Sequence, residues 1–433
     1  MIYKTPKNPN YVATIIKVPA LEKLDGLDNL RGLRMFGMQA LVSKDVQVGD
    51  VGVLFSTEVQ LSKDFCKENN LFRHSVFNRD LDKKGYLDDN RRVKAIKLKG
   101  HRSDSLFMSL DCFAYLGVNP SDFKVNDTFD FINDKEICRK YVIREEGVKG
   151  PKNQTPKIRR VDEKNFPQHF DTDNFWRNLQ KIPVGSRVVI TQKLHGTSIR
   201  FGNVPVARDL KWYEKLAQKF GVKVQTEEHK FVVGSRTVVK SLDGQTESGK
   251  SHFYAEDEWT KFLYTTNIPE VIPQNFMVFG ELIGWTSTGA PIQKNYTYNL
   301  SQGQTALYVY RVAIVINGRV VDLQWEQVKR FCKDHGMNHV PEIDTYDVAD
   351  HRDFESLIDD VFVDKRYSEY FTITNDPMIP LSNADTVDEG VCIRYDGENG
   401  PYVLKAKSPI FLGHESKLLD TGAQDIESGE AAV

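Results

Sequence analysis

The stretch Val188–Gly202, VVITQKLHGTSIRFG, places a lysine where it could act as a nucleophile. The β-branched run up to Thr191 favours a strand, and Gly196 begins a turn signal before a second strand-like run. Lys193 therefore stands at a predicted strand end, beside a glycine that lets a ligand approach the backbone. An ordinary surface lysine fits the same residues, so the rest of the chain has to decide between the two interpretations.

Three more stretches carry residue types suited to a nucleotide. Arg236 lies in FVVGSRTVV, a predicted strand, and offers its planar guanidinium to a phosphate or is a strand-surface charge. Glu281 follows the apolar run FMVFG and needs a partner, either a ribose hydroxyl, a metal-bound water or a core arginine. Tyr308 and Tyr310 share one face of ALYVYRVAIV, where one stacks on a purine or both belong to the core.

The most informative stretch is DEGVCIRYDGENGPYVLKAKS, which predicts a β-hairpin. Lys405 and Lys407 point to one face, and an anionic ligand between them would remove the repulsion of like charges that a solvated strand would tolerate. Glu389, at the head of the partner strand, suits a divalent cation. Together these groups suit nucleotidyl transfer, in which an amine attacks an α-phosphate, cations neutralise the phosphate oxygens and a metal assists the leaving pyrophosphate.

Composition limits the setting of this chemistry. The chain has 433 residues, of which 27% are charged, and a net charge of −2, so any nucleic-acid surface must be local. No apolar run approaches the ~20 residues of a membrane span, and the N-terminus lacks a secretory signal. The cysteines, five in all, are irregularly spaced, which favours the cytoplasm or another reducing intracellular compartment.

The chain divides by pattern into four segments. The first has short β-rich runs typical of a small barrel of the OB type and carries a basic stretch, RRVKAIKLKGHR, which we expect to bind nucleic acid through Arg91, Arg92, Lys94, Lys97 and Lys99. The second is a polar linker with a short helix, and its Arg159 and Arg160 are further candidates for nucleic-acid binding. The third alternates strands and helices as an α+β domain, and the fourth is acidic and expected to be disordered. The predicted boundaries are 1–145, 146–183, 184–412 and 413–433.

The ordered motifs resemble those of the covalent nucleotidyltransferases, which comprise DNA ligases, RNA ligases and mRNA capping enzymes. Their usual nucleophile motif is Lys-x-Asp-Gly, and this chain has Lys193-Leu194-His195-Gly196. Histidine in this slot resembles the RNA ligases of the phage and RNA-editing type, and it removes a carboxylate that some relatives use near the metal. The β-rich module precedes the motifs, and only 25 residues follow Ser408, which resembles a smaller RNA ligase class. The fold class implied is α+β, with an N-terminal OB-type β-barrel followed by a nucleotidyltransferase (ATP-grasp-like ligase) domain of antiparallel sheets and helices.

The resemblance also implies a role for each motif residue. Lys193 would carry AMP once neighbouring cations and the metal favour its neutral amine, and His195 would orient pyrophosphate or a metal-bound water, or only pack in the turn. The nucleotide would be bound by Arg236 at a phosphate, Glu281 at the ribose, Tyr310 at the adenine, and Lys405 and Lys407 at the α-phosphate. The metal would be served by Glu389, and by Glu281 through water.

The function implied is that of an ATP-dependent RNA ligase. ATP would be its substrate and Mg²⁺ or Mn²⁺ its metal, and it would join RNA 3′-hydroxyl and 5′-phosphate ends through a lysyl-AMP and an adenylylated 5′ end. We expect a monomer that acts on RNA and not at a membrane. A DNA or mixed-strand ligase is the alternative with the same chemistry, and a non-catalytic protein that binds nucleic-acid ends is the alternative of another class.

Overall fold

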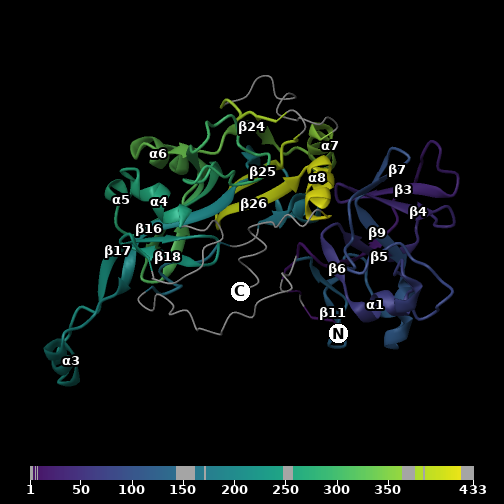
Figure 1. Ribbon diagram of the computed structural model, residues 1–433, viewed down its shortest axis with the longest axis horizontal. Helices are drawn as coiled ribbons and strands as arrows, with labels where there is room; N and C mark the ends of the chain where they lie inside the picture. Colours follow the sequence, from purple (N-terminus) through teal and green to yellow (C-terminus); the bar gives the residue numbers. More distant parts are fainter. Residues whose placement is uncertain are drawn as a thin grey trace.

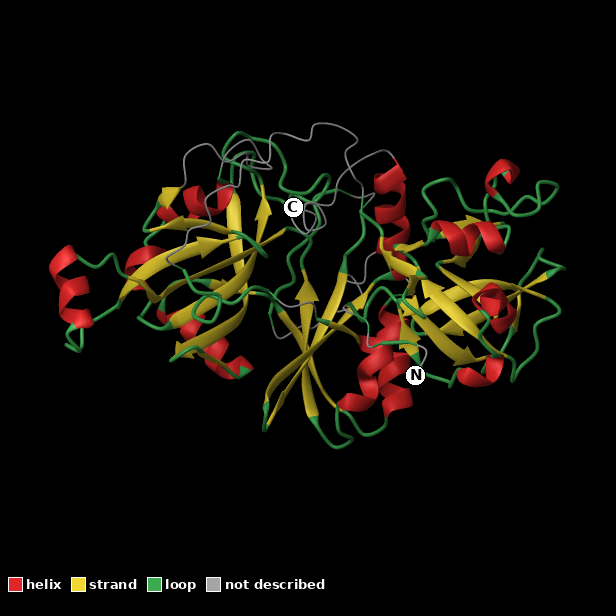
Figure 2. Cartoon of the chain, turned by 90° about the horizontal axis from the view of Figure 1, so that it is seen from below, coloured by secondary structure: helices red, strands yellow, loops and turns green. Residues whose placement is uncertain are grey.

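The fold is known from a computed structural model, which describes residues 3–4, 6, 8–142, 161–169, 172–246, 257–362, 376–383 and 386–420. Three groups of strands lie side by side along the molecule, with the helices placed around them (Figures 1 and 2). Almost all strand pairs are antiparallel, which confirms the expected α+β class with antiparallel sheets. Among the described residues, none of the helices combines the length and apolarity that a membrane crossing needs.

The N-terminal region contains a seven-stranded sheet in the order β10-β1-β5-β9-β4-β3-β2, packed on a core rich in phenylalanine. Its end strands, β10 and β2, are not paired with each other, so the expected closed barrel is not found among the described residues. The elements of this region are β1 (Ala13–Lys17), β2 (Glu22–Lys23), β3 (Leu30–Met35), β4 (Met38–Ser43), β5 (Val51–Ser56), β6 (Val59–Leu61), α1 (Lys63–Glu68), β7 (Ile96–Leu98), β8 (His101–Ser103), β9 (Ser105–Ser109), β10 (Thr128–Phe129), β11 (Phe131–Ile132), β12 (Lys135–Glu136) and β13 (Cys138–Lys140).

A five-stranded sheet occupies the middle of the molecule, in the order β14-β26-β25-β15-β24. The alternating apolar residues of β15 and β25 pack with α2 and α7 into one core. Asn174, and not the expected Asp173, caps the short helix α2, because its side chain accepts from the backbone N–H of Arg177. The elements are β14 (Asp173–Asn174), α2 (Phe175–Asn178), β15 (Arg187–Lys193), β24 (Glu342–Asp347), α7 (His351–Val361), β25 (Gly390–Gly397), β26 (Gly400–Lys407) and α8 (Pro409–Asp420).

The third sheet runs in the order β19-β18-β17-β16-β20-β21-β22, with β23 paired to β21. It is apolar on both faces, and a separate buried cluster covers each of them. The elements are β16 (Thr197–Ala207), α3 (Trp212–Lys219), β17 (Glu227–Gly234), β18 (Val239–Leu242), β19 (Gln245–Thr246), α4 (Glu258–Tyr264), α5 (Ile268–Val271), β20 (Phe276–Gly284), β21 (Thr305–Ile316), β22 (Arg319–Asp322), α6 (Trp325–Asp334) and β23 (Asn338–His339).

The C-terminal segment differs from its prediction. Helix α8 continues to Asp420, so the predicted disordered tail does not begin at 413. Buried Phe411 and Ser416 anchor this helix, which explains why an acidic composition did not prevent it from forming there. Residues 421–433 lie outside the described part of the chain.

Candidate active site

The predicted lysine lies at the junction of the two C-terminal sheets. β15 ends at Lys193, and β16 begins at Thr197 in the neighbouring sheet. The turn requires glycine, because a Cβ on Gly196 would lie 2.1 Å from the backbone oxygen of Leu282. On its other side, β15 pairs with β25 so that Lys193 is opposite Gly390. The end of the first strand of one motif is thereby fixed beside the start of the predicted hairpin, which the structure confirms.

Glu389 joins the two basic motifs. Its Oε1 lies 2.7 Å from Nζ of Lys193 and 3.5 Å from Nζ of Lys407, and only 4% of its side chain is exposed. Burial alone would raise the pKa of Glu389, but the charges of Lys193 and Lys407, with a smaller contribution from His195, lower it below its usual value. Glu389 is therefore held as a carboxylate inside the site.

The second carboxylate oxygen of Glu389 is available to a further ligand. Within the described part of the chain this buried Oε2 has no hydrogen-bond partner, and Nδ1 of His195 lies 3.8 Å away. The His195 ring packs edge-on against Tyr296 and Phe411, with centroids 4.8 and 5.1 Å away, and its backbone N–H donates to the Tyr298 hydroxyl at 2.7 Å. The departure from the usual aspartate thus places an imidazole, in a fixed orientation, next to an unsatisfied carboxylate oxygen.

Glu281 lies on β20, across the sheet from the turn that follows Lys193. It accepts hydrogen bonds from the N–H of Gly196 at 3.1 Å and from the Ser198 hydroxyl at 3.4 Å. Its partner is therefore not a core arginine, as one alternative had it, but the nucleophile turn itself. Glu281 lines the same cavity as Lys193 and Glu389.

Lys405 and Lys407 of β26 both line this cavity, as their spacing predicted. Lys407 also lies 3.5 Å from Glu415 of α8. Burial lowers the pKa of Lys407, but the carboxylates of Glu415, Glu58 and Glu389 outweigh it and raise the pKa well above its usual value. Lys407 is therefore a permanent cation in the site.

The N-terminal region supplies residues that the sequence reasoning missed. Tyr11, Glu58 and Lys140 line the same cavity as the lysines of β26. Burial raises the pKa of Glu58, but Lys407 and a hydrogen bond with Glu415 are the main causes that bring it down to about 2. No sequence signal links Glu58 to the motifs, because it follows β5 in a turn of a different sheet.

The remaining nucleotide candidates have different surroundings. Tyr310 lines the cavity, and its hydroxyl lies 2.8 Å from Nε2 of His169, whereas Tyr308 lines a separate groove beside α6. The two tyrosines are thus not equivalent, although they share a strand face. Arg236 lines the cavity as well, but from the turn after β17 and not from a strand as predicted. Gly234 ends that strand at a register shift, which the alternating sequence pattern did not indicate.

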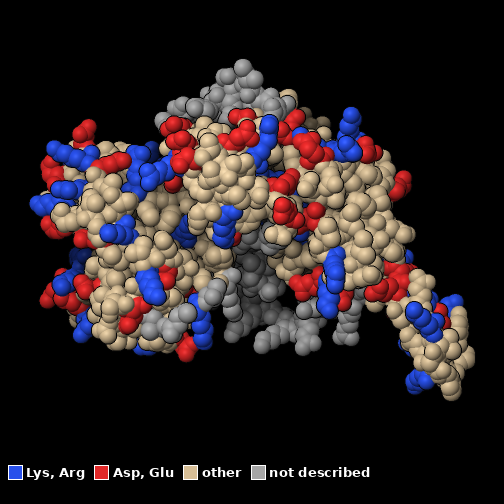
Figure 3. All heavy atoms as spheres, turned by 180° about the vertical axis from the view of Figure 1, so that it is seen from behind, with Lys and Arg blue, Asp and Glu red and all other residues tan. Residues whose placement is uncertain are grey.

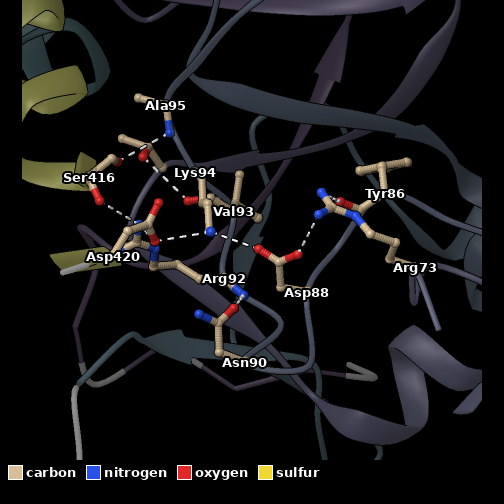
Figure 4. A network of polar contacts seen from close by, with 11 residues as sticks. Arg73, Tyr86, Asp88, Asn90, Arg92, Val93, Lys94, Ala95, Ser416 and Asp420 are labelled. Carbon is tan, nitrogen blue, oxygen red and sulfur yellow. Dashed lines mark hydrogen bonds and ion pairs between the residues drawn. The ribbon is translucent and has the colours of Figure 1, made fainter. Parts of the chain in front are cut away.

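The basic stretch was interpreted wrongly in part. Arg92 is 1% exposed and donates to the backbone oxygen of Ser416 and to Asp420, so its guanidinium joins the N-terminal region to α8 (Figure 4). Lys94 lies between Asp88 and Asp420, at 2.7 and 3.0 Å. Both side chains are used within the protein, because the acidic partners come from segments far away in the sequence.

The other basic candidates lie elsewhere. Lys97 and Lys99 are exposed on the hairpin of β7 and β8, which is separate from the seven-stranded sheet, and Arg91 is half-buried beside the network of Figure 4. The expected barrel strand with a basic outer face is therefore this small hairpin. Arg159 and Arg160 lie outside the described residues.

Comparisons with known proteins agree with this geometry. The family model described as RNA ligase matches residues 186–407, which include every predicted motif from Lys193 to Lys407. A search of curated proteins found no match. Among solved structures, a variant of Naegleria gruberi RNA ligase with ATP and Mn is 16% identical, with a TM-score of 0.57 over 94% of this chain and 98% of that one. The same enzyme with pyrophosphate is 15% identical, with a TM-score of 0.57 over 94% and 98%.

Proposed function

The chain belongs to the RNA ligase family, and from this membership we propose that it is an ATP-dependent RNA ligase that joins 3′-hydroxyl and 5′-phosphate ends. The observation that carries the proposal is the convergence of Lys193, Glu281, Glu389, Lys405 and Lys407 on one cavity. The Naegleria structures with ATP and Mn, and with AMP and Mn, support ATP as the substrate.

In the first step, the Lys193 amine attacks the α-phosphorus of ATP. A nitrogen–phosphorus bond forms, the bond to the pyrophosphate oxygen breaks, and the amine loses a proton. Lys405 and Lys407 neutralise the charge that develops on the phosphate oxygens, Glu281 accepts from the ribose, and Tyr310 stacks on adenine. Because Glu389 forms an ion pair with Lys193 in the ligand-free structure, this pair has to separate before the amine reacts.

A divalent cation, Mg²⁺ or Mn²⁺, fits the acidic group of this site. The unsatisfied Oε2 of Glu389 is a hard oxygen ligand, and Glu281 offers a second carboxylate through water. Such a cation, when bound, supplies positive charge to the phosphate oxygens and draws Glu389 away from Lys193.

In the two later steps the RNA becomes the substrate. The 5′-phosphate attacks the lysyl-AMP, which frees Lys193 and leaves an adenylylated 5′ end. The 3′-hydroxyl then attacks that end, a phosphodiester forms, and AMP departs. His195 beside Glu389 acts in the first step, where pyrophosphate leaves.

We also propose a division of labour along the chain. Residues 1–145 form the nucleic-acid-binding module of the OB type, 146–183 the linker with its short helix, and 184–412 the nucleotidyltransferase domain. Lys97 and Lys99, which are exposed, remain the candidates for RNA contact in the first module, while Arg92 and Lys94 hold the junction with α8. The contribution of Glu58 to the cavity means that the first module also borders the nucleotide site.

Labelling with α-³²P nucleotides tests the proposal. Label on the protein from ATP, which is lost in Lys193→Ala, supports the ligase, and label from GTP would instead indicate a capping enzyme. Sealing assays with all-RNA, all-DNA and mixed strands separate an RNA ligase from a DNA or mixed-strand ligase. An absence of label with intact binding of RNA ends would refute the enzyme and leave an end-binding protein.

A further inference from the structure

A helical arm, residues 208–226, projects from the third sheet between β16 and β17. It carries α3 and stands apart from the body of the protein at one end of the molecule (Figures 1 and 3). Arg208 braces its neck: the side chain donates to the backbone oxygen of Gln225 and pairs with Glu214 at 2.6 Å. The arm is therefore an ordered part of the protein, although it contributes nothing to a described core.

The apolar face of this arm is uncovered. Trp212 is 77% exposed and Phe220 78%, and Tyr213 and Leu216 are also exposed. No residue of α3 is buried. Because folding gains nothing from leaving aromatic rings in water, a contiguous exposed face of this kind indicates a binding surface.

A row of lysines runs beside the aromatic face. Lys211, Lys215 and Lys219 follow one another at intervals of four residues, which places them along one side of the helix. Lys215 and Lys219 form no ion pair with the described part of the chain, and Glu214 is already paired with Arg208. The arm thus presents uncompensated positive charge next to exposed rings.

The two strands that carry the arm lead directly to the active site. β16 starts just after the His195–Gly196 turn, and β17 returns to Arg236, which lines the cavity. Continuous pairing from Arg200–Gly234 to Ala207–Glu227 makes these strands one ribbon. At about 3.3 Å per residue, the ribbon holds the arm roughly 35 Å from the nucleophile.

We propose that the arm binds single-stranded RNA that leads away from the ends being joined. Exposed rings beside a lysine row are what a flexible strand needs, since bases stack on the rings and phosphates contact the lysines. A second copy of the arm would meet its own positive charge, and an eight-residue helix offers little apolar surface to a membrane. The inference rests on the proposed function, because it takes RNA as the substrate.

Trp212 provides the readout. The other tryptophans are buried or half-buried, so acrylamide quenching of the emission reports mainly on this residue. We expect a single strand of about 20 nucleotides without a 5′-phosphate to protect Trp212 from the quencher. We also expect Trp212→Ala with Phe220→Ala to weaken binding of that strand by about five- to a hundredfold, and Trp212→Tyr with Phe220→Tyr to preserve it.

The lysine row is tested separately by a matched pair of variants. Changing Lys211, Lys215 and Lys219 to glutamine should lower the slope of log affinity against log salt by about 2 to 3, and the same changes to arginine should keep it. Labelling with ATP should be unchanged in every arm variant, since the arm lies far from Lys193. If labelling of the wild-type protein fails, the proposed function is wrong regardless of the arm.

Three results would overturn the arm proposal while leaving the ligase intact. The first is an alanine variant that binds the strand as tightly as the wild type. The second is protection of Trp212 by self-association, seen as a dimer in sedimentation that the alanine pair abolishes. The third is protection by vesicles of anionic lipid and none by RNA.

Discussion

The junction in Figure 4 leads to an asymmetric prediction about stability. We compare Arg92→Met, which keeps the apolar stem but removes the charge, with Asp420→Ala. In the wild type, Arg92 gains two charge-assisted hydrogen bonds, at 2.8 and 2.9 Å, and contacts the Tyr141 ring at 5.1 Å. These contribute about 3–6 kcal/mol, but the buried Nε and Nη1 have no partner and cost about 1–3 kcal/mol each.

The two variants therefore differ in what they leave behind. Arg92→Met removes the attractions and the unsatisfied atoms together, so we expect a loss of only about 1–2 kcal/mol in the free energy of unfolding. Asp420→Ala leaves the guanidinium 1% exposed without its carboxylate, and we expect a loss of about 3 kcal/mol even though Asp420 itself is 43% exposed.

Urea unfolding followed by tryptophan emission measures both values. Ser416→Ala is the matched control for the helix, because its backbone oxygen, which accepts from Arg92, is retained. If Arg92→Met proves more destabilising than Asp420→Ala, the buried charge is satisfied in a way that these contacts do not contain, and the reasoning fails.

Three further predictions concern the cavity. Lys193→Ala should abolish labelling by ATP yet retain sealing of RNA that already carries a 5′-adenylate, and persistent label on the variant would contradict its role as nucleophile. Glu58 has its pKa lowered to about 2, so its ionised form should contribute up to about 3 kcal/mol above pH 4.5 that is lost as the pH falls towards 2. Glu58→Gln should therefore narrow its stability gap to the wild type over that interval in acid titrations, and a constant gap would count against coupling to Lys407. His195→Ala should slow adenylylation at least tenfold and spare the last step, as single-turnover rates will show, whereas equal losses would indicate only a packing role.

Local pattern was sufficient for the motif elements. The β-branched run before Lys193, the glycine of the turn and the alternating hairpin of Lys405 and Lys407 each record their structure within a few residues. Their order along the chain also indicated the family, which the match over 186–407 confirms.

Long-range pairing explains what the sequence did not reveal. Arg92 looked like a surface charge because its partners, Ser416 and Asp420, are distant in the sequence and carry no motif. Glu58 was missed for the same reason, since only the fold brings it to Lys407. Barrel closure depends on which end strands meet, and short alternating runs such as those of β10 and β2 specify that weakly.

The pairing of Lys193 with Gly390 has a consequence for biosynthesis. The nucleophile leaves the ribosome long before its neighbours: at 5–20 residues per second, translation takes about 10–40 s to proceed from Lys193 to Lys407. During that interval β15 lacks β25, and neither Glu389 nor the lysines of β26 exist. A nascent chain thus carries the reactive residue without a site to activate it, and it cannot consume ATP. Reaction with ATP would then mark chains whose synthesis and folding have reached the last strand, so labelling of stalled or truncated chains would report how far the sheet has been completed.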